Sequence, residues 1–350
     1  MESTTKNRQS PETLRALIER AYGADAVPTT SDFAHEITEG WFNVAYRITL
    51  RDSRQVVLKI APPANVPVLT REVNMMRAEL EAMRLVSTQT TVPVPRVDFA
   101  DLTHELIDAD YFFMEYIDAD NFGFSTHLSP EVIAAGNREL GALNREINTI
   151  TGPHFGPLVG PGYPTWREAF HAMIEDTLTD GERVGIDLGW TSNDIRSVIH
   201  ENAAALDEVT VPHLVEVDLW TKNSMIRDGR IVAILDHERA IYGDPLMEAG
   251  LTGLDLPSFG DPTNFMIGFG IASPADPSSA GLTPTRQTHA GLTPTTLTPA
   301  QRTRRRLYSL YLAVIMIVET KYRGHTDTEV YDLGRECLDA LMAQFGRLTP

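Results

Sequence analysis

The stretch 214–248 constrains the fold of this chain more than any other part of its sequence. It places Asp218 five residues before Asn223, and its apolar run IVAIL ends at Asp236. The pair Asp228-Gly229 is typical of a tight turn between two antiparallel strands. Because such a hairpin returns the chain to its starting point, it brings Asn223, at the start of the first strand, close to Asp236.

These three polar side chains form a set that is typical of phosphoryl transfer. The carboxylate of Asp218 can orient an acceptor hydroxyl and take its proton. Asn223 and Asp236 offer oxygen ligands, which Mg²⁺ prefers, so they are predicted to hold Mg²⁺ against nucleotide phosphates. The alternative interpretation is a surface hairpin that carries scattered acids with no joint role.

Lys59 supplies a cation of the kind that such a site needs. It lies in the apolar run VVLKI, so an anionic group is expected near its ammonium. The predicted helix that follows carries Glu72 and Glu79, which are seven residues apart and lie near one helical face. Either glutamate can hold the lysine toward a nucleotide. Taken alone, Lys59 is better explained as an edge-strand lysine whose ammonium reaches water.

The segment Glu39–Asn43 precedes Lys59 and takes the place of a loop that covers phosphates. Gly40 permits a close approach of the backbone to a phosphate, and Asn43 ends the loop, so both are candidate nucleotide-binding residues. A single glycine is equally an ordinary turn former. The sequence has no GxGxxG and no Walker A motif, so this loop supports a nucleotide site only together with Lys59.

The order of predicted elements favours an α+β fold with two lobes. The first part is rich in predicted strands, at 41–50, 55–61 and 110–117, with helices at 12–22 and 70–86. The later part is mainly helical, with helices expected at 130–146, 165–178, 192–207, 303–322 and 327–345. We therefore place a nucleotide-binding lobe at 1–117 and a larger helical lobe, with the catalytic loop and acceptor site, at 118–350.

Residues 273–300 differ in composition from the rest of the chain. They are rich in Pro, Thr, Ser and Gly, and the sequence AGLTPT occurs at 280–285 and again at 290–295. A short echo without an apolar period cannot form a packed repeat, so the segment is predicted to be a flexible insertion.

The charge balance limits the partners of this protein. With 30 Lys and Arg against 48 Asp and Glu, the formal net charge is −18. This acidity argues against nucleic acid or an anionic membrane as a partner, and it suits a cationic substrate. It is also explained by solubility alone.

Cysteine content and terminal sequence bear on the compartment. Cys337 is the single cysteine, which excludes a disulfide within the chain and a metal site built from cysteines. The N-terminal segment has no apolar core of the signal-peptide type, and no apolar run is long enough to span a bilayer. We therefore expect a cytoplasmic protein, with no indication of its oligomeric state.

Taken together, these residues resemble the aminoglycoside phosphotransferase family, which includes choline kinase-like members and has a protein-kinase-like fold. In that family a His-x-Asp loop, here 216–218, leads to a metal-binding asparagine that matches Asn223. The metal-binding aspartate matches Asp236, and a Gly-Asp-Pro motif matches 243–245. The resemblance covers about residues 33–345, interrupted by the insertion.

The resemblance also implies roles in the first lobe. Lys59 would bind the nucleotide, and the distance to the VPVP sequence at 92–95 makes Glu79 a better partner for it than Glu72. The strand FFMEYI is similar to a hinge strand, where the carbonyl of Glu115 and the amide of Ile117 would meet adenine. The implied cofactors are ATP or GTP together with Mg²⁺.

One position departs from the family pattern. Glu216 stands where the family has its loop histidine. That histidine is a structural support, so its replacement is compatible with catalysis. We expect Glu216 to be held by a neighbouring arginine or to shape an acidic site. Asp244 is predicted to have a structural role, as the N-cap of an apolar helix.

Three functions compete at this point. The first is a kinase that uses ATP or GTP to phosphorylate a small hydroxylated molecule, an aminated antibiotic or a choline-, sugar- or homoserine-like metabolite. The second is a protein kinase, which the missing D-F-G and A-P-E motifs and the short interval between Asp236 and Asp244 disfavour. The third is a catalytically silent nucleotide-binding protein, for which Glu216 is the only argument.

Overall fold

The first part of the chain folds around a five-stranded antiparallel sheet. The computed structural model describes residues 3–271 and 296–347. The strand order is β1-β2-β3-β5-β4, and the elements are β1 (Ala34–Ile37), β2 (Val44–Thr49), β3 (Gln55–Ile60), β4 (Val97–Asp101) and β5 (Tyr111–Glu115). Inward-facing residues of β2 and β3 alternate with residues of the other face, as the period of a strand requires. Lys59 lies in β3, the central strand of this sheet.

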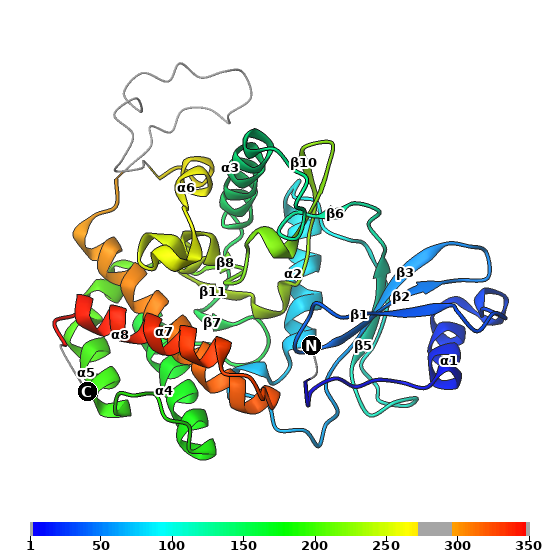
Figure 1. The fold of residues 1–350 in the computed structure, drawn as a ribbon, viewed down its shortest axis with the longest axis horizontal. Coiled ribbons are helices and arrows are strands. Elements are labelled where there is room, and N and C mark those ends of the chain that lie inside the picture. Colours follow the sequence, from blue (N-terminus) through cyan, green and yellow to red (C-terminus); the bar gives the residue numbers. More distant parts are fainter. Residues whose placement is uncertain (1–2, 272–295, 348–350) are drawn as a thin grey trace.

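Two helices cover the two faces of this sheet. Helix α1 (Pro11–Tyr22) begins at the N-cap Ser10, whose hydroxyl accepts from the amide of Thr13. It packs Leu17 and its apolar neighbours against one face. Helix α2 (Met75–Gln89) packs against the other face through methionines that contact Phe112. In Figure 1, α2 lies between the sheet and the helical part of the molecule.

The start of α2 differs from the sequence prediction of one helix over 70–86. Residues Thr70–Glu72 form a separate 3₁₀ turn, and the helix begins only at Met75. Between them Asn74 has φ of 66°, in the left-handed region that interrupts a right-handed helix. The break turns Glu72 away from the face of α2 that carries Glu79.

The rest of the chain is mainly helical, as predicted. Its helices are α3 (Pro130–Ile147), α4 (Trp166–Val184), α5 (Ser192–Glu201), α6 (Thr263–Phe269), α7 (Pro299–Arg323) and α8 (Glu329–Gln344). The predicted helix 192–207 ends as an α-helix at Glu201 and continues as the 3₁₀ turn Ala203–Glu208. Helix α7 is buried along most of its length and forms the centre of the larger core. The α+β prediction, a small antiparallel sheet followed by a helical part, is confirmed (Figure 1).

The later part of the chain also contributes two three-stranded sheets. One contains β6 (Asp120–Asn121), β9 (Ser224–Arg227) and β10 (Arg230–Ile234), and the other contains β7 (Gly156–Pro157), β8 (His213–Val215) and β11 (Ile241–Gly243). The β9–β10 turn has positive φ at Asp228 and Gly229, as the sequence predicts for a tight hairpin. The division into lobes at residue 117 stays a prediction.

Most of the predicted insertion, 273–300, lies outside the described residues. The prediction is wrong at its end, because α7 begins at Pro299 behind the N-cap Thr298. Thr298 and Gln301 form a capping box that fixes this helix start. Among the helices of the described ranges, none combines the length and apolar character that a membrane span requires.

Candidate active site

Asp218 lies in a loop between β8 and β9. The loop leaves β8 through Val217, which has φ of 66°, and it ends in the 3₁₀ turn Thr221–Asn223. The side-chain amide of Asn223 donates to the carbonyl of Asp218 at 2.9 Å, which fixes the loop and leaves the amide oxygen for another partner. Asn223 precedes β9 instead of starting it, a difference of one residue from the predicted strand.

The second loop carries Asp236 directly after β10. The amide of Leu235 donates to the carbonyl of Asn223 at 2.9 Å, so the hairpin holds the two predicted metal ligands in adjacent chain segments. Asp236 itself is in the left-handed region, with φ of 62° and ψ of 56°. This conformation is costly for a residue other than glycine, and such strain is concentrated at functional sites.

Lys59 contacts three carboxylates at once. Its Nζ lies 2.8 Å from both oxygens of Glu79, 2.6 Å from Asp236 Oδ1 and 3.1 Å from Glu238 Oε2. Of the two glutamates considered from the sequence, Glu79 therefore contacts the lysine. Glu238 was missed, although its position two residues after Asp236 could have indicated it.

Burial and charge oppose each other in this cluster. Burial alone would lower the pKa of Lys59, but Asp236, Glu238 and Glu79 outweigh it and raise that pKa well above its ordinary value. Burial, together with repulsion by Asp236, raises the pKa of Glu238 to about 8. The pKa of Asp236 is lowered instead, because the charge of Lys59 outweighs the effect of burial. The lysine is thus a fixed cation, and Asp236 stays ionised beside it.

The carboxylate of Asp218 is partly accessible, with 27% of its side chain exposed. Its Oδ2 lies 3.6 Å from Nε of Arg239, whose Nη2 is 3.4 Å from Glu319. Burial raises the pKa of Asp218, and the charge of Arg239 opposes that rise. A carboxylate whose pKa is raised, and which a substrate can reach, is suited to take a proton.

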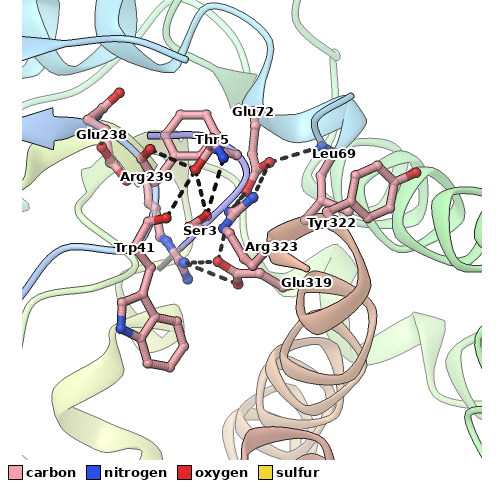
Figure 2. A network of polar contacts seen from close by, with 12 residues as sticks. Ser3, Thr5, Trp41, Leu69, Glu72, Glu238, Arg239, Glu319, Tyr322 and Arg323 are labelled. Atoms are coloured by element: carbon pink, nitrogen blue, oxygen red, sulfur yellow. Dashed lines mark hydrogen bonds and ion pairs between the residues drawn. The ribbon is translucent and has the colours of Figure 1, made fainter. Parts of the chain in front are cut away.

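Glu72 belongs to a different network. Arg323, near the end of α7, pairs with Glu72 and also with Glu319, 2.8 Å away (Figure 2). In the same view Arg239 reaches Glu319 from the loop that follows Asp236. This chain of charges connects the turn before α2 with α7 and with the arginine beside Asp218.

The expectation of an arginine partner for Glu216 is wrong. Glu216 Oε2 lies 3.0 Å from Nδ1 of His237, and both side chains are buried. Burial lowers the pKa of His237, but Glu216 outweighs it, and the net pKa is raised. The other ring nitrogen of His237 lies 3.1 Å from the carbonyl of Ile234. A glutamate in the Asp218 loop and a histidine after Asp236 therefore connect the two loops.

The loop 39–43 closes over the lysine cluster from the first sheet. The side-chain amide of Asn43 donates to Glu238 at 2.6 Å, and the backbone carbonyl of Asn43 accepts from Nζ of Lys6 at 2.7 Å. Gly40 lies close to the same ammonium. Lys6 was not predicted, because a single lysine near the N-terminus carries no sequence signal for a site.

The two predicted hinge residues lie at the end of β5. Glu115 is the last residue of that strand, and its amide donates to the carbonyl of Arg96. Ile117 follows two residues later, and its carbonyl accepts from Ala119. Their contact with adenine stays a prediction.

Glu248 supports the catalytic loop and was not predicted. It is fully buried and accepts from the amide of Leu219 at 2.7 Å, directly after Asp218. Its other oxygen accepts from the side chain of Asn144 in α3. Asp244 does cap its segment, accepting from the amide of Leu246, although the capped element is a 3₁₀ turn.

The donor set fits Mg²⁺. Asp236 and Asn223 offer a carboxylate and an amide oxygen, the hard ligands that this ion binds. Glu79, Asp236 and Glu238 also lie close enough together to share a cation. Because the ammonium of Lys59 is within 3.1 Å of all three, it already fills that role among them. The assignment of the metal to Asp236 and Asn223 stays a prediction.

Comparison with known proteins decides the family. Residues 34–278, more than half of the chain, match the sequence model of the phosphotransferase enzyme family, also named APH. The chain belongs to this family. No curated protein sequence matched it.

Solved structures show that the family fold extends over nearly the whole chain. A thermostable mutant of aminoglycoside phosphotransferase APH(4)-Ia, in a ternary complex with AMP-PNP and hygromycin B, has a TM-score of 0.65 and 18% identity, covering 95% of this chain and 99% of that one. A protein from Thermobifida fusca YX-ER1, provisionally assigned as a fructosamine-3-kinase, has a TM-score of 0.60 at 18% identity (96% and 100% covered). The gentamicin–APH(2")-IIa complex has a TM-score of 0.59 at 14% identity (96% and 98% covered). The kinase-like fold is thereby confirmed.

Proposed function

We propose that this phosphotransferase moves the γ-phosphate of ATP or GTP to a hydroxyl group of a small molecule. The observation that carries the proposal is the pairing of two loops. One presents the partly exposed carboxylate of Asp218, and the other presents Asp236 to Lys59. Asn223 bonds to both loops, so a proton acceptor and a phosphate-binding cation are held in a fixed position relative to each other.

In this proposal Asp218 accepts the proton of the acceptor hydroxyl. The hydroxyl oxygen then forms a bond to the γ-phosphorus as the bond to the β–γ bridging oxygen breaks, and the nucleoside diphosphate leaves. Lys59, held by Glu79, stabilises the charge on the phosphates. Mg²⁺, held by Asp236 and Asn223, would supply further charge neutralisation at the phosphates.

The nucleotide site would lie between the first sheet and the Asp236 loop. Gly40 and Asn43 would cover the phosphates, and the backbone of Glu115 and Ile117 would meet the base. The AMP-PNP in the similar APH(4)-Ia complex supports an adenine nucleotide, and GTP stays the alternative. We further propose that the enzyme acts in the cytoplasm, without nucleic acid or membrane as partner.

Two arguments favour an aminoglycoside as the acceptor. The net charge of −18 suits a cationic substrate, and the similar structures include complexes with hygromycin B and gentamicin. A metabolite acceptor is the alternative, and the fructosamine kinase assignment of one similar structure supports it.

The test is the substitution Asp218→Ala. Without the carboxylate the acceptor hydroxyl has no proton acceptor, so transfer from labelled ATP or GTP to a panel of aminoglycosides, sugars and amino alcohols should be lost. Nucleotide binding, measured by calorimetry, should be nearly unchanged because Lys59 and Asp236 remain. Normal turnover by this variant would contradict the role of Asp218. Binding of nucleotide without transfer by the wild-type protein would favour the silent alternative.

A further inference from the structure

A lysine of the N-terminal arm, residues 3–7, lies against the loop 39–43. Nζ of Lys6 donates to the backbone carbonyl of Asn43 at 2.7 Å. The side chain of Asn43 donates in turn to Glu238, and Glu238 Oε2 lies 3.1 Å from Nζ of Lys59. Two residues therefore connect the ammonium of Lys6 to the lysine of the proposed nucleotide site.

The ammonium of Lys6 has no counter-charge in contact with it. Among the described residues, no carboxylate forms an ion pair with this half-buried side chain. Burial lowers the pKa of Lys6, and the more distant charge of Glu36 opposes this shift only in part. Lys59 differs, because three carboxylates contact it directly. A partly buried charge without a partner is costly, so an anion that binds beside Lys6 would be stabilised there.

The loop beside this ammonium has room and donors for such an anion. A Cβ atom placed on Gly40 would lie 3.9 Å from Nζ of Lys6, and no other atom of the described residues would lie within 4 Å of it. The backbone amides of residues 40–42 donate to no other residue of the described ranges. Free backbone amides in a loop, together with a cation, are the donors that phosphate-binding loops use.

The arm fixes the backbone on both sides of Lys6. The hydroxyl of Thr4 donates to a carbonyl near the end of α7, and that of Thr5 donates to the carbonyl of Trp41 at 3.1 Å (Figure 2). On the other side, the side chain of Asn7 donates to the backbone just after β3. Lys6 therefore starts from an ordered backbone, which reduces the entropy that its side chain loses when it binds a ligand.

We infer that Lys6 is a second phosphate-binding cation, which bonds to a phosphate oxygen of the nucleotide at the open side of the loop. The inference rests on the proposed function and adds a residue to its nucleotide site. A triphosphate carries more negative charge than Lys59 and one Mg²⁺ neutralise together, so a further cation stabilises it. Lys6 reaches the phosphates from the arm, whereas Lys59 reaches them from the sheet.

The first experiment measures which part of the nucleotide depends on Lys6. Wild type and Lys6→Gln are titrated, with Mg²⁺ present, with ATP, ADP, AMP and adenosine, and in parallel with GTP, GDP, GMP and guanosine. Lys6→Gln should weaken binding of the triphosphate by about tenfold, because a charge-assisted hydrogen bond is lost. Binding of the nucleoside should be unchanged. An unchanged affinity for the triphosphate overturns the inference. Equal losses for triphosphate and nucleoside also overturn it, because Lys6 would then only support the loop.

Two further variants separate the position of the charge from its presence. Lys6→Arg retains a cation on the arm and should recover part of the lost affinity. Lys321→Gln removes the same charge from an exposed lysine of α7, so it is the matched control and should bind the triphosphate as the wild type does. A loss in Lys321→Gln as large as that in Lys6→Gln would contradict the inference, since net charge would explain it. Melting temperatures show that each variant is folded.

Kinetics distinguish this inference from the proposed function. Lys6→Gln should raise KM for the nucleotide by about tenfold and leave KM for the acceptor unchanged. Transfer that requires Asp218, with a normal nucleotide KM in Lys6→Gln, would leave the proposed function intact and overturn the inference alone. Failure of the wild-type chain to bind either ATP or GTP would count against both proposals.

Discussion

At the scale of single residues, the pair Glu216–His237 shows how the site departs from its family pattern without losing its frame. The family places a histidine at the position of Glu216. Here a histidine lies after Asp236 instead, 3.0 Å from the glutamate. The two loops that carry Asp218 and Asp236 are therefore still joined through a buried side-chain contact.

Removal of this glutamate should be strongly destabilising. Glu216→Ala leaves a buried histidine of raised pKa without its counter-charge, and such a loss costs about 3–5 kcal/mol. Glu216→Gln should cost less, because it retains a polar partner. Urea unfolding measures both. Glu81→Ala, which breaks an exposed pair with Arg84, is the control and should cost about 0–1 kcal/mol. Equal losses in Glu216→Ala and Glu81→Ala would show that the buried pair contributes no more than a surface pair.

At the scale of elements, the sequence predicts what local chemistry determines. The β9–β10 hairpin follows from Asp228-Gly229, and the helices follow from their apolar periodicity. The start of α2 could not be predicted in this way, because the left-handed Asn74 depends on how the preceding turn packs. That packing involves Asp180 of α4, which accepts from the amide of Thr70.

The same limit applies to the candidate site. Residues that share a short motif, such as Asp218 and Asn223, can be recognised from spacing. Partners that meet only in the folded chain cannot be recognised in this way. Arg71 and Arg305, for example, are separated by more than half of the sequence, yet they line one pocket. Net charge is limited in the same way, since it says nothing about the local distribution of charge.

Glu248, which is buried beside the catalytic loop, should make the stability of the folded protein depend on pH. Burial, reinforced by repulsion from Glu216, raises its pKa from 4.5 to about 7. A carboxyl group with a raised folded-state pKa binds more protons in the folded than in the unfolded state between these values. Stability is therefore lost as the pH rises through this window, by about 3 kcal/mol at most.

The substitution Glu248→Gln tests this dependence. Glutamine does not titrate, so the variant lacks this contribution, and the unfolding free energy of the wild type relative to that of the variant should fall as the pH rises from 5 to 8. Urea unfolding at several pH values measures it. Parallel curves for the two proteins would show that Glu248 does not titrate in this range.

At the scale of the whole molecule, the N-terminal arm of residues 3–7 joins the two halves of the site. Thr4 bonds to the carbonyls of Tyr322 and Arg323 at the end of α7. In the loop that would cover the phosphates, the hydroxyl of Thr5 lies 3.1 Å from the carbonyl of Trp41 (Figure 2) and 2.8 Å from the carbonyl of Phe42. Lys6 continues the contact to Asn43. The arm therefore connects the helical part to this loop.

Loss of this connection should release the loop. Thr5→Val keeps the shape of the side chain but removes the donor to the carbonyls of Trp41 and Phe42, at a cost of about 1–2 kcal/mol. Hydrogen–deuterium exchange at 41–43 should become faster, while α8 is unchanged. Ser10→Ala is the control, because it removes the α1 N-cap at a similar cost of about 1 kcal/mol and makes no contact with the loop. Equal exchange at 41–43 in both variants would contradict the role of the arm, since the effect would then follow from lower stability alone.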